Sequence, residues 1–204
     1  MSEQVIFRRK LDREDFERMN LPSAYWKVKV HGAPQSVREP ILRYLKGIDR
    51  FLADGVGLLV VGNPGVGKTA LAALCAKEAR SRGYTVLFTT VWEMREAIRA
   101  RVPFETDETL LQRAQKVDLL ILDDLRVDDV KQGWFGRSEI EAIVAARAAG
   151  QKATIITSQM GYVDLRRDLP ALMDSAQGCM VTMAVSGPNL RESRREELKK
   201  AIFG

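Results

Sequence analysis

Cysteine, histidine and long apolar runs are scarce in this chain of 204 residues. Its two cysteines, Cys75 and Cys179, are too few for a disulfide framework and lack the spacing of a metal site, so we expect buried thiols. The single histidine, His31, is expected at the surface and offers no basis for histidine catalysis. Because no apolar run could span a bilayer and the first residues lack the apolar core of a secretory signal, we expect a cytoplasmic protein without a membrane segment.

Positive charge, in contrast, is in excess. The formal net charge is +5, the calculated pI is about 9.3, and basic residues cluster at 8–10, 166–167, 194–195 and 199–200. Such a balance permits contact with nucleic acid. Each cluster taken singly is explained slightly better as a solvated helix face, so charge alone does not decide the partner.

The order of apolar segments predicts an α/β fold. From residue 58 onward, short β-prone runs alternate with segments of helical spacing, which is typical of a mostly parallel sheet covered by helices on both faces. The strands of the predicted five-stranded sheet are residues 58–61, 85–89, 118–123, 154–158 and 179–183. The predicted helices are residues 37–53, 69–82, 91–101, 107–116, 138–149 with Ser138 as N-terminal cap, and a mostly exposed helix from about 188 to 202.

Residues 62–69 read Gly-Asn-Pro-Gly-Val-Gly-Lys-Thr, which matches the P-loop pattern G-x-x-x-x-G-K-[ST] between an apolar strand and a helix. The glycines let the main chain curl so that its N–H groups face phosphates, and the helix adds its positive end. Lys68 is predicted to contact the β and γ phosphates of ATP during catalysis, and the Thr69 hydroxyl to ligate Mg²⁺. The residues expected to bind the nucleotide are Gly62, Asn63, Pro64, Gly65, Val66, Gly67, Lys68, Thr69 and Ala70.

A second motif, at residues 119–124, places two carboxylates at the end of an apolar strand, as in a Walker B motif. Asp123 is predicted to bind Mg²⁺, and Asp124 to orient or deprotonate the attacking water, although a strand-end cap would also explain Asp124. Gln159, after the next strand, is the candidate sensor of the γ-phosphate, and a surface turn explains it almost as well. The GTPase patterns D-x-x-G and N-K-x-D are not found at or after Asp123, so ATP is favoured over GTP.

Together these motifs resemble the DnaC/IstB family of AAA+ ATPases, which includes replicative helicase loaders and ATPase helpers of insertion-sequence transposases. The resemblance covers roughly residues 20–203. It is carried by residues 62–69, 120–125, 154–158 and 187–191 and by Trp134 and Arg147, which flank the intervening helix. It implies a P-loop NTPase of the AAA+ (ASCE) type with a reduced C-terminal lid, ATP hydrolysis, and a catalytic sensor role for Arg191 at the γ-phosphate.

The chain departs from this family pattern at two places. Gln159 stands where family members usually carry asparagine. Family members also carry a Ser-Arg pair whose arginine acts on the ATP of a neighbouring subunit, and residues 172–177 hold no arginine. Arg166 or Arg167, and next Arg137, could replace it during self-association through ATP-site interfaces. We therefore expect slow basal turnover.

The predicted organisation is an N-terminal extension over residues 1–36 and an AAA+ ATPase domain over residues 37–204. The extension could bind a partner through a helical hook that includes Leu11, Phe16, Met19 and Tyr25. The resemblance favours a helicase loader that uses ATP and Mg²⁺ to deliver a replicative DNA helicase onto single-stranded DNA. The alternatives are a transposition helper ATPase, acting on duplex DNA and a transposase, and a nucleotide-binding regulatory module with little hydrolysis.

Overall fold

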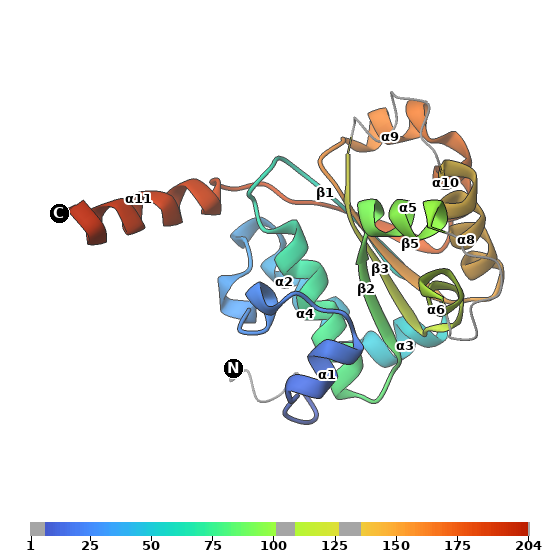
Figure 1. Cartoon of the computed structure of the whole chain (residues 1–204), viewed down its shortest axis with the longest axis horizontal. Coiled ribbons are helices and arrows are strands. Elements are labelled where there is room, and N and C mark those ends of the chain that lie inside the picture. Colours follow the sequence, from blue (N-terminus) through green and yellow to red (C-terminus); the bar gives the residue numbers. More distant parts are fainter. Residues whose placement is uncertain (1–6, 101–108, 127–135, 204) are drawn as a thin grey trace.

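A sheet of five parallel strands runs through the middle of the molecule (Figure 1). The computed structural model describes residues 7–100, 109–126 and 136–203. The strands are β1 (Gly57–Val61), β2 (Val86–Thr90), β3 (Leu119–Leu125), β4 (Ala153–Ser158) and β5 (Met180–Ala184), in the spatial order β2-β3-β4-β1-β5. Every neighbouring pair is parallel, so the predicted fold class and the predicted strands are confirmed to within two residues at each end.

Alternate residues of the central strands pack on opposite faces of the sheet. In β1, Leu58 and Val60 belong to one core cluster, whereas Leu59 and Val61 belong to the other. Successive side chains of a strand point to opposite faces, and here both faces are covered. This is why the central strands are uninterrupted apolar runs rather than alternating patterns.

Helices cover both faces of the sheet, as predicted. One face carries α2 (Gln35–Lys46), α3 (Ile48–Ala53) and α4 (Lys68–Ser81). The other carries α5 (Val91–Arg99), α6 (Leu110–Lys116), α8 (Arg137–Ala149), α9 (Tyr162–Asp168) and α10 (Pro170–Ala176). The predicted helix ends at residues 101 and 107, like Trp134, lie outside the described residues.

The predicted single helix over residues 37–53 is wrong. Gly47 ends α2 and immediately precedes α3, so the segment forms two helices. Glycine has a low helix propensity, and a β-carbon at this position would lie 2.8 Å from the ring of Phe51. The position is therefore filled by a residue that both interrupts the helix and makes room for the aromatic ring.

The predicted cap of the helix over residues 138–149 is also wrong. Helix α8 begins at Arg137, and its N-cap is Gly136, which has a φ of 84° and no side chain to contribute. Ser138 lies inside the first turn, where its hydroxyl donates to the Glu139 carboxylate at 2.9 Å. The left-handed conformation of Gly136 lets the helix begin at residue 137, two residues earlier than it would with Ser138 as the cap.

The N-terminal segment begins with α1 (Arg13–Arg18) and packs along α4 and the outer edge of β2. Of the apolar side chains expected in a partner hook, Met19 is 1% exposed, and Leu11, Phe16 and Tyr25 pack against the same core cluster. These side chains therefore stabilise the chain's own fold. The division of the chain at residue 36 stays a prediction.

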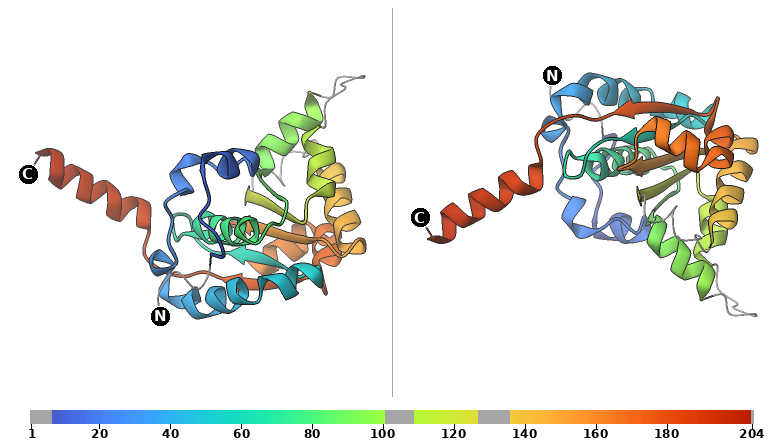
Figure 2. Two further views of the ribbon diagram at one scale, coloured as in Figure 1. Left: turned by 90° about the horizontal axis from the view of Figure 1, so that it is seen from below. Right: turned by 90° about the horizontal axis from the view of Figure 1, so that it is seen from above.

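The last helix, α11 (Leu190–Phe203), extends away from the sheet (Figure 1, Figure 2). None of its residues is buried, in agreement with the predicted exposed helix. Its first residue nevertheless contacts the P-loop, because the Leu190 N–H donates to the Gly65 carbonyl at 3.0 Å. The chain therefore passes over the P-loop just before it leaves the domain.

The residue types that are scarce in the sequence lie largely as predicted. Cys75 is buried and His31 is exposed, whereas Cys179 is only partly buried. Both cysteines are free thiols. Across the described ranges, no helix combines the length and the apolar character needed to cross a membrane.

Candidate active site

The P-loop joins the carboxyl end of β1 to the amino end of α4. Gly62, Gly65 and Gly67 have φ angles of 155°, 80° and 101°. Such positive φ angles are unfavourable for residues that have a β-carbon. At Gly65, a β-carbon would also overlap the side chain of Asn189. These glycines allow the tight curl that the motif predicts, and the curl surrounds a hollow.

The amino end of α4 offers main-chain donors to this hollow. The helix is 14 residues long, and its N-cap Gly67 provides no side-chain hydrogen bond. Gly67, Lys68, Thr69 and Ala70 all line the hollow. The first N–H groups of a helix have no partner within the helix, and the helix dipole adds positive charge. This end of α4 therefore suits a phosphate group.

The Lys68 ammonium group lies directly over the loop. Lys68 is 8% exposed, and its Nζ donates to the main-chain oxygens of Gly62 and Asn63, each at 2.8 Å. Burial lowers the pKa of Lys68, and the charges of Asp124 and Asp123 partly oppose this shift. The predicted phosphate contact and the two predicted acids are thus within electrostatic reach of one another.

Asp123 lies near the carboxyl end of β3 and is 5% exposed. Its Oδ1 accepts a hydrogen bond of 2.6 Å from the Thr157 hydroxyl on β4, and the Thr69 side chain also hydrogen-bonds to its carboxylate. Burial raises the pKa of Asp123, while these two hydroxyl groups act in the opposite direction. The structure therefore brings together Thr69 and Asp123, the two predicted ligands of Mg²⁺.

Asp124 occupies an irregularity at the end of β3. Its φ is 64°, and the pairing of β3 with β4 shifts register between Leu122 and Leu125. The Asp124 N–H donates to the Thr157 hydroxyl at 2.9 Å instead of continuing the sheet. Bulges and left-handed residues other than glycine concentrate at functional sites because they redirect a side chain. Here the bulge directs Asp124 to the hollow beside Asp123.

Two side chains hold the Asp124 carboxylate. Its Oδ2 accepts hydrogen bonds from Nε of Arg126 at 2.7 Å and from Nη2, and its Oδ1 accepts one from Gln159 Nε2 at 3.1 Å. Burial alone would raise the pKa of Asp124, but these hydrogen bonds and the Arg126 charge lower it on balance. A carboxylate of low basicity orients a water molecule better than it removes a proton.

Of the groups described above, Gly65, Gly67, Lys68, Thr69, Asp124, Thr157 and Gln159 line a single pocket of about 280 Å³. Asp123 lies just behind it, hydrogen-bonded to Thr69 and Thr157. Arg191 and Arg194, from the start of α11, line it as well, and the charge of Arg191 contributes to lowering the pKa of Lys68. The N-terminal segment adds Ala24, Tyr25 and Val28. Every part of the predicted site that falls on described residues is thus gathered at one end of the sheet.

Thr157, Arg126, Arg194 and the N-terminal contributors were missed by sequence reasoning. Thr157 could have been found as a polar residue two positions before Gln159 on an apolar strand. Arg126 stands where the GTPase pattern D-x-x-G, counted from Asp123, would require glycine, and that mismatch gave no hint of its contact with Asp124. Tyr25 and its neighbours carry no such signal, because they lie far upstream of the P-loop.

The arginine-finger candidates do not line this pocket. Each forms an ion pair within the chain: Arg166 with Asp174 at 3.4 Å, Arg167 with Asp168 at 2.7 Å and Arg137 with Glu141 at 2.9 Å. Carboxylates raise the pKa of Arg167 further, Asp168 most of all. Their action on a neighbouring subunit stays a prediction.

The residues of the pocket fit ATP together with Mg²⁺. The glycine curl, the uncapped start of α4 and the Lys68 ammonium group form a cradle for phosphates. Thr69 and Asp123 present the hard oxygen ligands that Mg²⁺ prefers, and this metal usually completes its coordination with phosphate and water.

Comparison with known proteins agrees with this geometry. The family model described as IstB-like ATP binding protein matches residues 32–170, a span that contains the P-loop, both acids and Gln159. The chain belongs to this family. The IstB-like family is thus the one that the motifs resemble, and ATP binding is its common property.

The relatives of this IstB-like protein carry names of two kinds. A putative insertion sequence ATP-binding protein of Sinorhizobium fredii is 30% identical over 122 residues, which are 60% of this chain and 40% of the relative. The replicative helicase loader DnaC of Escherichia coli is 29% identical over 109 residues, which are 52% of this chain and 44% of the relative. The chain spans less than half the length of both relatives.

A solved structure supports the same fold. The crystal structure of the DnaC helicase loader superposes with a TM-score of 0.68 and 23% identity, covering 81% of this IstB-like chain and 100% of that chain. A sequence identity of 23% supports a shared fold and no statement about function. The predicted α/β fold with a five-stranded parallel sheet is therefore confirmed.

Proposed function

We propose that this IstB-like protein is a Mg²⁺-dependent ATPase whose nucleotide state controls assembly with a partner on DNA. The observation that carries the ATPase is the position of Asp124, which a left-handed bulge directs to the P-loop between Gln159 and Lys68. A protein that only binds ATP needs no such acid beside its Mg²⁺ ligand.

Each residue has a role that follows from its contacts. Lys68 contacts the β and γ phosphates and stabilises the charge that develops during transfer. Thr69 and Asp123 would hold Mg²⁺, which when bound neutralises phosphate charge. Asp124 orients the attacking water, and Gln159 positions Asp124 through their hydrogen bond.

The two flanks of the pocket suit the remaining parts of the nucleotide. We assign Arg191 to the γ-phosphate, because it lies near Lys68. Tyr25 and Val28 provide the apolar and aromatic surface that an adenine ring requires. The N-terminal segment would then report whether ATP is bound.

Slow basal turnover follows from the surroundings of Asp124. Its carboxylate is held in an ion pair with Arg126, and its pKa is low, so it is a weak base. No arginine-finger candidate lines the pocket of the described chain. We expect the rate to rise when a partner or a second subunit supplies an arginine and displaces Arg126.

Phosphate release from Mg-ATP tests the chemical proposal. We expect slow release that stops on addition of EDTA and in Asp123→Ala, with the fold preserved by circular dichroism. ATP binding with no phosphate release under any condition, including added DNA, would instead favour the regulatory module.

For the partner, we propose a replicative DNA helicase delivered to single-stranded DNA. The relationship to the E. coli protein named replicative helicase loader supports this choice. Immobilised protein should retain the helicase in the presence of ATP and release it after hydrolysis. Single-stranded DNA should stimulate phosphate release more than duplex DNA does.

A transposition helper is the second candidate, because one relative is named an insertion sequence ATP-binding protein. This candidate predicts stronger stimulation by duplex DNA and retention of a transposase in place of the helicase. The same two assays, run side by side, therefore separate the candidates.

Self-association through the ATP site has its own test. If Arg166 or Arg167 acts on a neighbouring subunit, the rate per subunit should rise with protein concentration and fall in Arg166→Ala or Arg167→Ala. A concentration-dependent rate that survives both substitutions would move the role to Arg137.

A further inference from the structure

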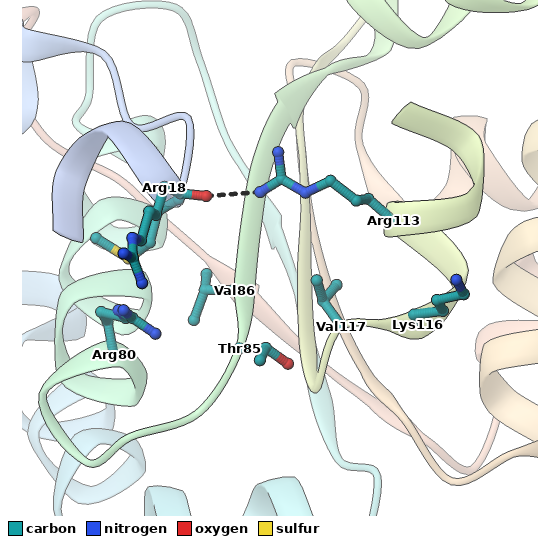
Figure 3. Close-up of a pocket in the computed structure, with 8 residues that line it drawn as sticks. Arg18, Arg80, Thr85, Val86, Arg113, Lys116 and Val117 are labelled. Carbon is teal, nitrogen blue, oxygen red and sulfur yellow. Dashed lines mark hydrogen bonds between the residues drawn. The ribbon is translucent and has the colours of Figure 1, made fainter. Parts of the chain in front are cut away.

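A second cavity, of about 370 Å³, lies at the amino end of the sheet (Figure 3). Val86, the first residue of β2, and Val117, just before β3, line it. Asp123 and Asp124 stand near the opposite end of β3. The two cavities therefore occupy opposite ends of the sheet.

Four cationic residues line this cavity, which we call the basic pocket. Arg18 comes from the end of α1, Arg80 from the end of α4, and Arg113 and Lys116 from α6 (Figure 3). None of the described residues that line it is acidic. Cations from three separate helices thus converge on one hollow.

The pairing of these cations leaves positive charge in excess. Arg80 donates to Asp15 at 2.9 Å, but the same carboxylate also accepts two hydrogen bonds from Arg9. Arg113 donates to the main-chain oxygen of Arg18 at 2.6 Å, which joins α6 to α1 without neutralising either arginine.

Two further acidic residues, Glu14 and Asp118, lie near the basic pocket. Glu14 pairs with Arg18 on the exposed side of α1, where such pairs are weak. The Asp118 carboxylate accepts hydrogen bonds from the N–H and hydroxyl groups of Thr85. Neither acid is bonded to Arg113, so its guanidinium group keeps its full charge toward the hollow.

The edge of β2 adds a main-chain donor. The Phe88 N–H donates to Met19 at 2.8 Å and the Phe88 oxygen accepts from Asn20 at 3.1 Å, so both groups face the outer edge of the sheet. Residues two apart on a strand direct their main-chain groups to the same side. The N–H group of Val86 therefore faces the side on which the basic pocket lies.

The positive surface continues beyond the hollow. The Lys152 ammonium group donates to the main-chain oxygen of Lys116, so the cations continue along the amino end of the sheet toward β4. A single anion could be bound by one cluster of cations. Cations that extend in a row instead match the regularly spaced negative charges of a polyanion. Arginine forks bind phosphate oxygens with two parallel hydrogen bonds.

We propose that the basic pocket binds the sugar-phosphate backbone of single-stranded nucleic acid. The small volume of the hollow, about 370 Å³, favours a single strand over a duplex. The proposal gives a location to the DNA contact of the proposed function and rests on it. ATP and DNA then bind at opposite ends of one sheet.

The test compares two double variants of the full chain. Arg113→Gln with Lys116→Gln removes charge from the basic pocket, and Lys46→Gln with Arg50→Gln removes the same charge from exposed positions on α2 and α3. Binding of a fluorescein-labelled oligothymidylate is measured at increasing KCl. The pocket variant should bind about 10-fold or more weakly at low salt, with the salt slope reduced by about 2, and the control should stay within about twofold.

Further variants separate loss of DNA binding from loss of folding or of ATP binding. If the pocket variant loses thermal stability, the exposed Lys116 alone is changed to glutamate, and a similar loss of binding is expected. Lys68→Ala should bind ATP more weakly yet keep its affinity for the oligothymidylate at low salt. Both pocket variants should keep wild-type ATP affinity.

Three results would overturn the proposal. Unchanged affinity and salt slope in the pocket variants would show that DNA binds elsewhere, and the proposed function would stand. A wild-type protein that binds no oligothymidylate, with or without ATP, would remove the DNA part of the proposed function as well. Polyglutamate is tested as a competitor at equal charge. If it displaces the oligothymidylate and its own binding is lost in the same variants, the basic pocket is a site for an acidic peptide.

Discussion

At the carboxyl end of the sheet, Asp124 and Lys68 line an open pocket, whereas at the amino end Arg147 is enclosed by its own chain. Arg147 is 1% exposed. Its guanidinium group donates to the hydroxyl of Thr154 and to main-chain oxygens of residues 114, 115, 117, 118 and 153.

This difference separates a structural charge from a functional one. Burial lowers the pKa of Arg147 to about 10, so the group stays charged at neutral pH. Each of the three nitrogen atoms of its guanidinium group has a hydrogen-bond acceptor. Asp124, in contrast, has a left-handed backbone and faces a pocket. A fully enclosed charge holds elements together, while a charge that faces a pocket remains available to a ligand.

The largest effect is expected at the enclosed charge. Arg147→Ala leaves several buried carbonyl groups without a donor and opens a cavity between α6, α8 and β4. We expect a loss of about 3–5 kcal/mol in the free energy of unfolding by urea titration. The exposed Arg50→Ala should change it by less than about 0.5 kcal/mol. Equal losses in the two variants would contradict the structural role.

At the pocket, the substitution Asp124→Asn should act on chemistry rather than on folding. The amide can still accept from Gln159 but cannot orient and polarise water as a carboxylate does. We expect Mg-ATP to bind and turnover to fall by about 10²- to 10³-fold, measured as phosphate release. Turnover at the wild-type rate would assign Asp124 to the strand-end cap.

Lys68→Ala tests the phosphate cradle itself. The charged hydrogen bonds to the β and γ phosphates are lost, which corresponds to about 10- to 100-fold in ATP affinity by calorimetry. AMP, which lacks these phosphates, should bind the variant and the wild type equally. Unchanged ATP affinity would place the phosphates away from Lys68.

A smaller effect, and a dependence on pH, is expected at the second enclosed charge. Asp15 is 5% exposed, and hydrogen bonds from Arg9, Asp12 and Arg80 hold its pKa well below the usual range, although burial opposes them. A lowered pKa gives stability that is present above the ordinary aspartate pKa and is lost as pH falls. Asp15→Asn should therefore cost about 1–2 kcal/mol at pH 7, and progressively less below about pH 4.

The exposed Glu14→Gln serves as the matched control for Asp15→Asn. Its ion pair with Arg18 lies in solvent, so we expect a change below about 0.5 kcal/mol at all pH values. A cost for Asp15→Asn that does not vary with pH would show that shape rather than charge is what matters at this position.

Much of the fold could be predicted because its signals are local. Apolar runs at residues 58–61 and 119–122 are buried on both faces, and glycine and charge mark where they end. The errors arose where one residue decided a boundary, as Gly47 did between α2 and α3. Apolar spacing continues through such a residue, so periodicity cannot detect the break.

By itself, the sequence determined the order of strands and helices, the P-loop, and the two acids at the carboxyl end of β3, because each depends on residues adjacent in the chain. Only the tertiary structure decided what surrounds them. Gln159 meets Asp124 because β3 and β4 are neighbours, and Tyr25 reaches the pocket because the N-terminal segment packs along α4. The basic pocket likewise exists only where α1, α4 and α6 converge. Contacts between distant segments depend on how the helices pack on the sheet, and no local pattern in the sequence encodes that packing.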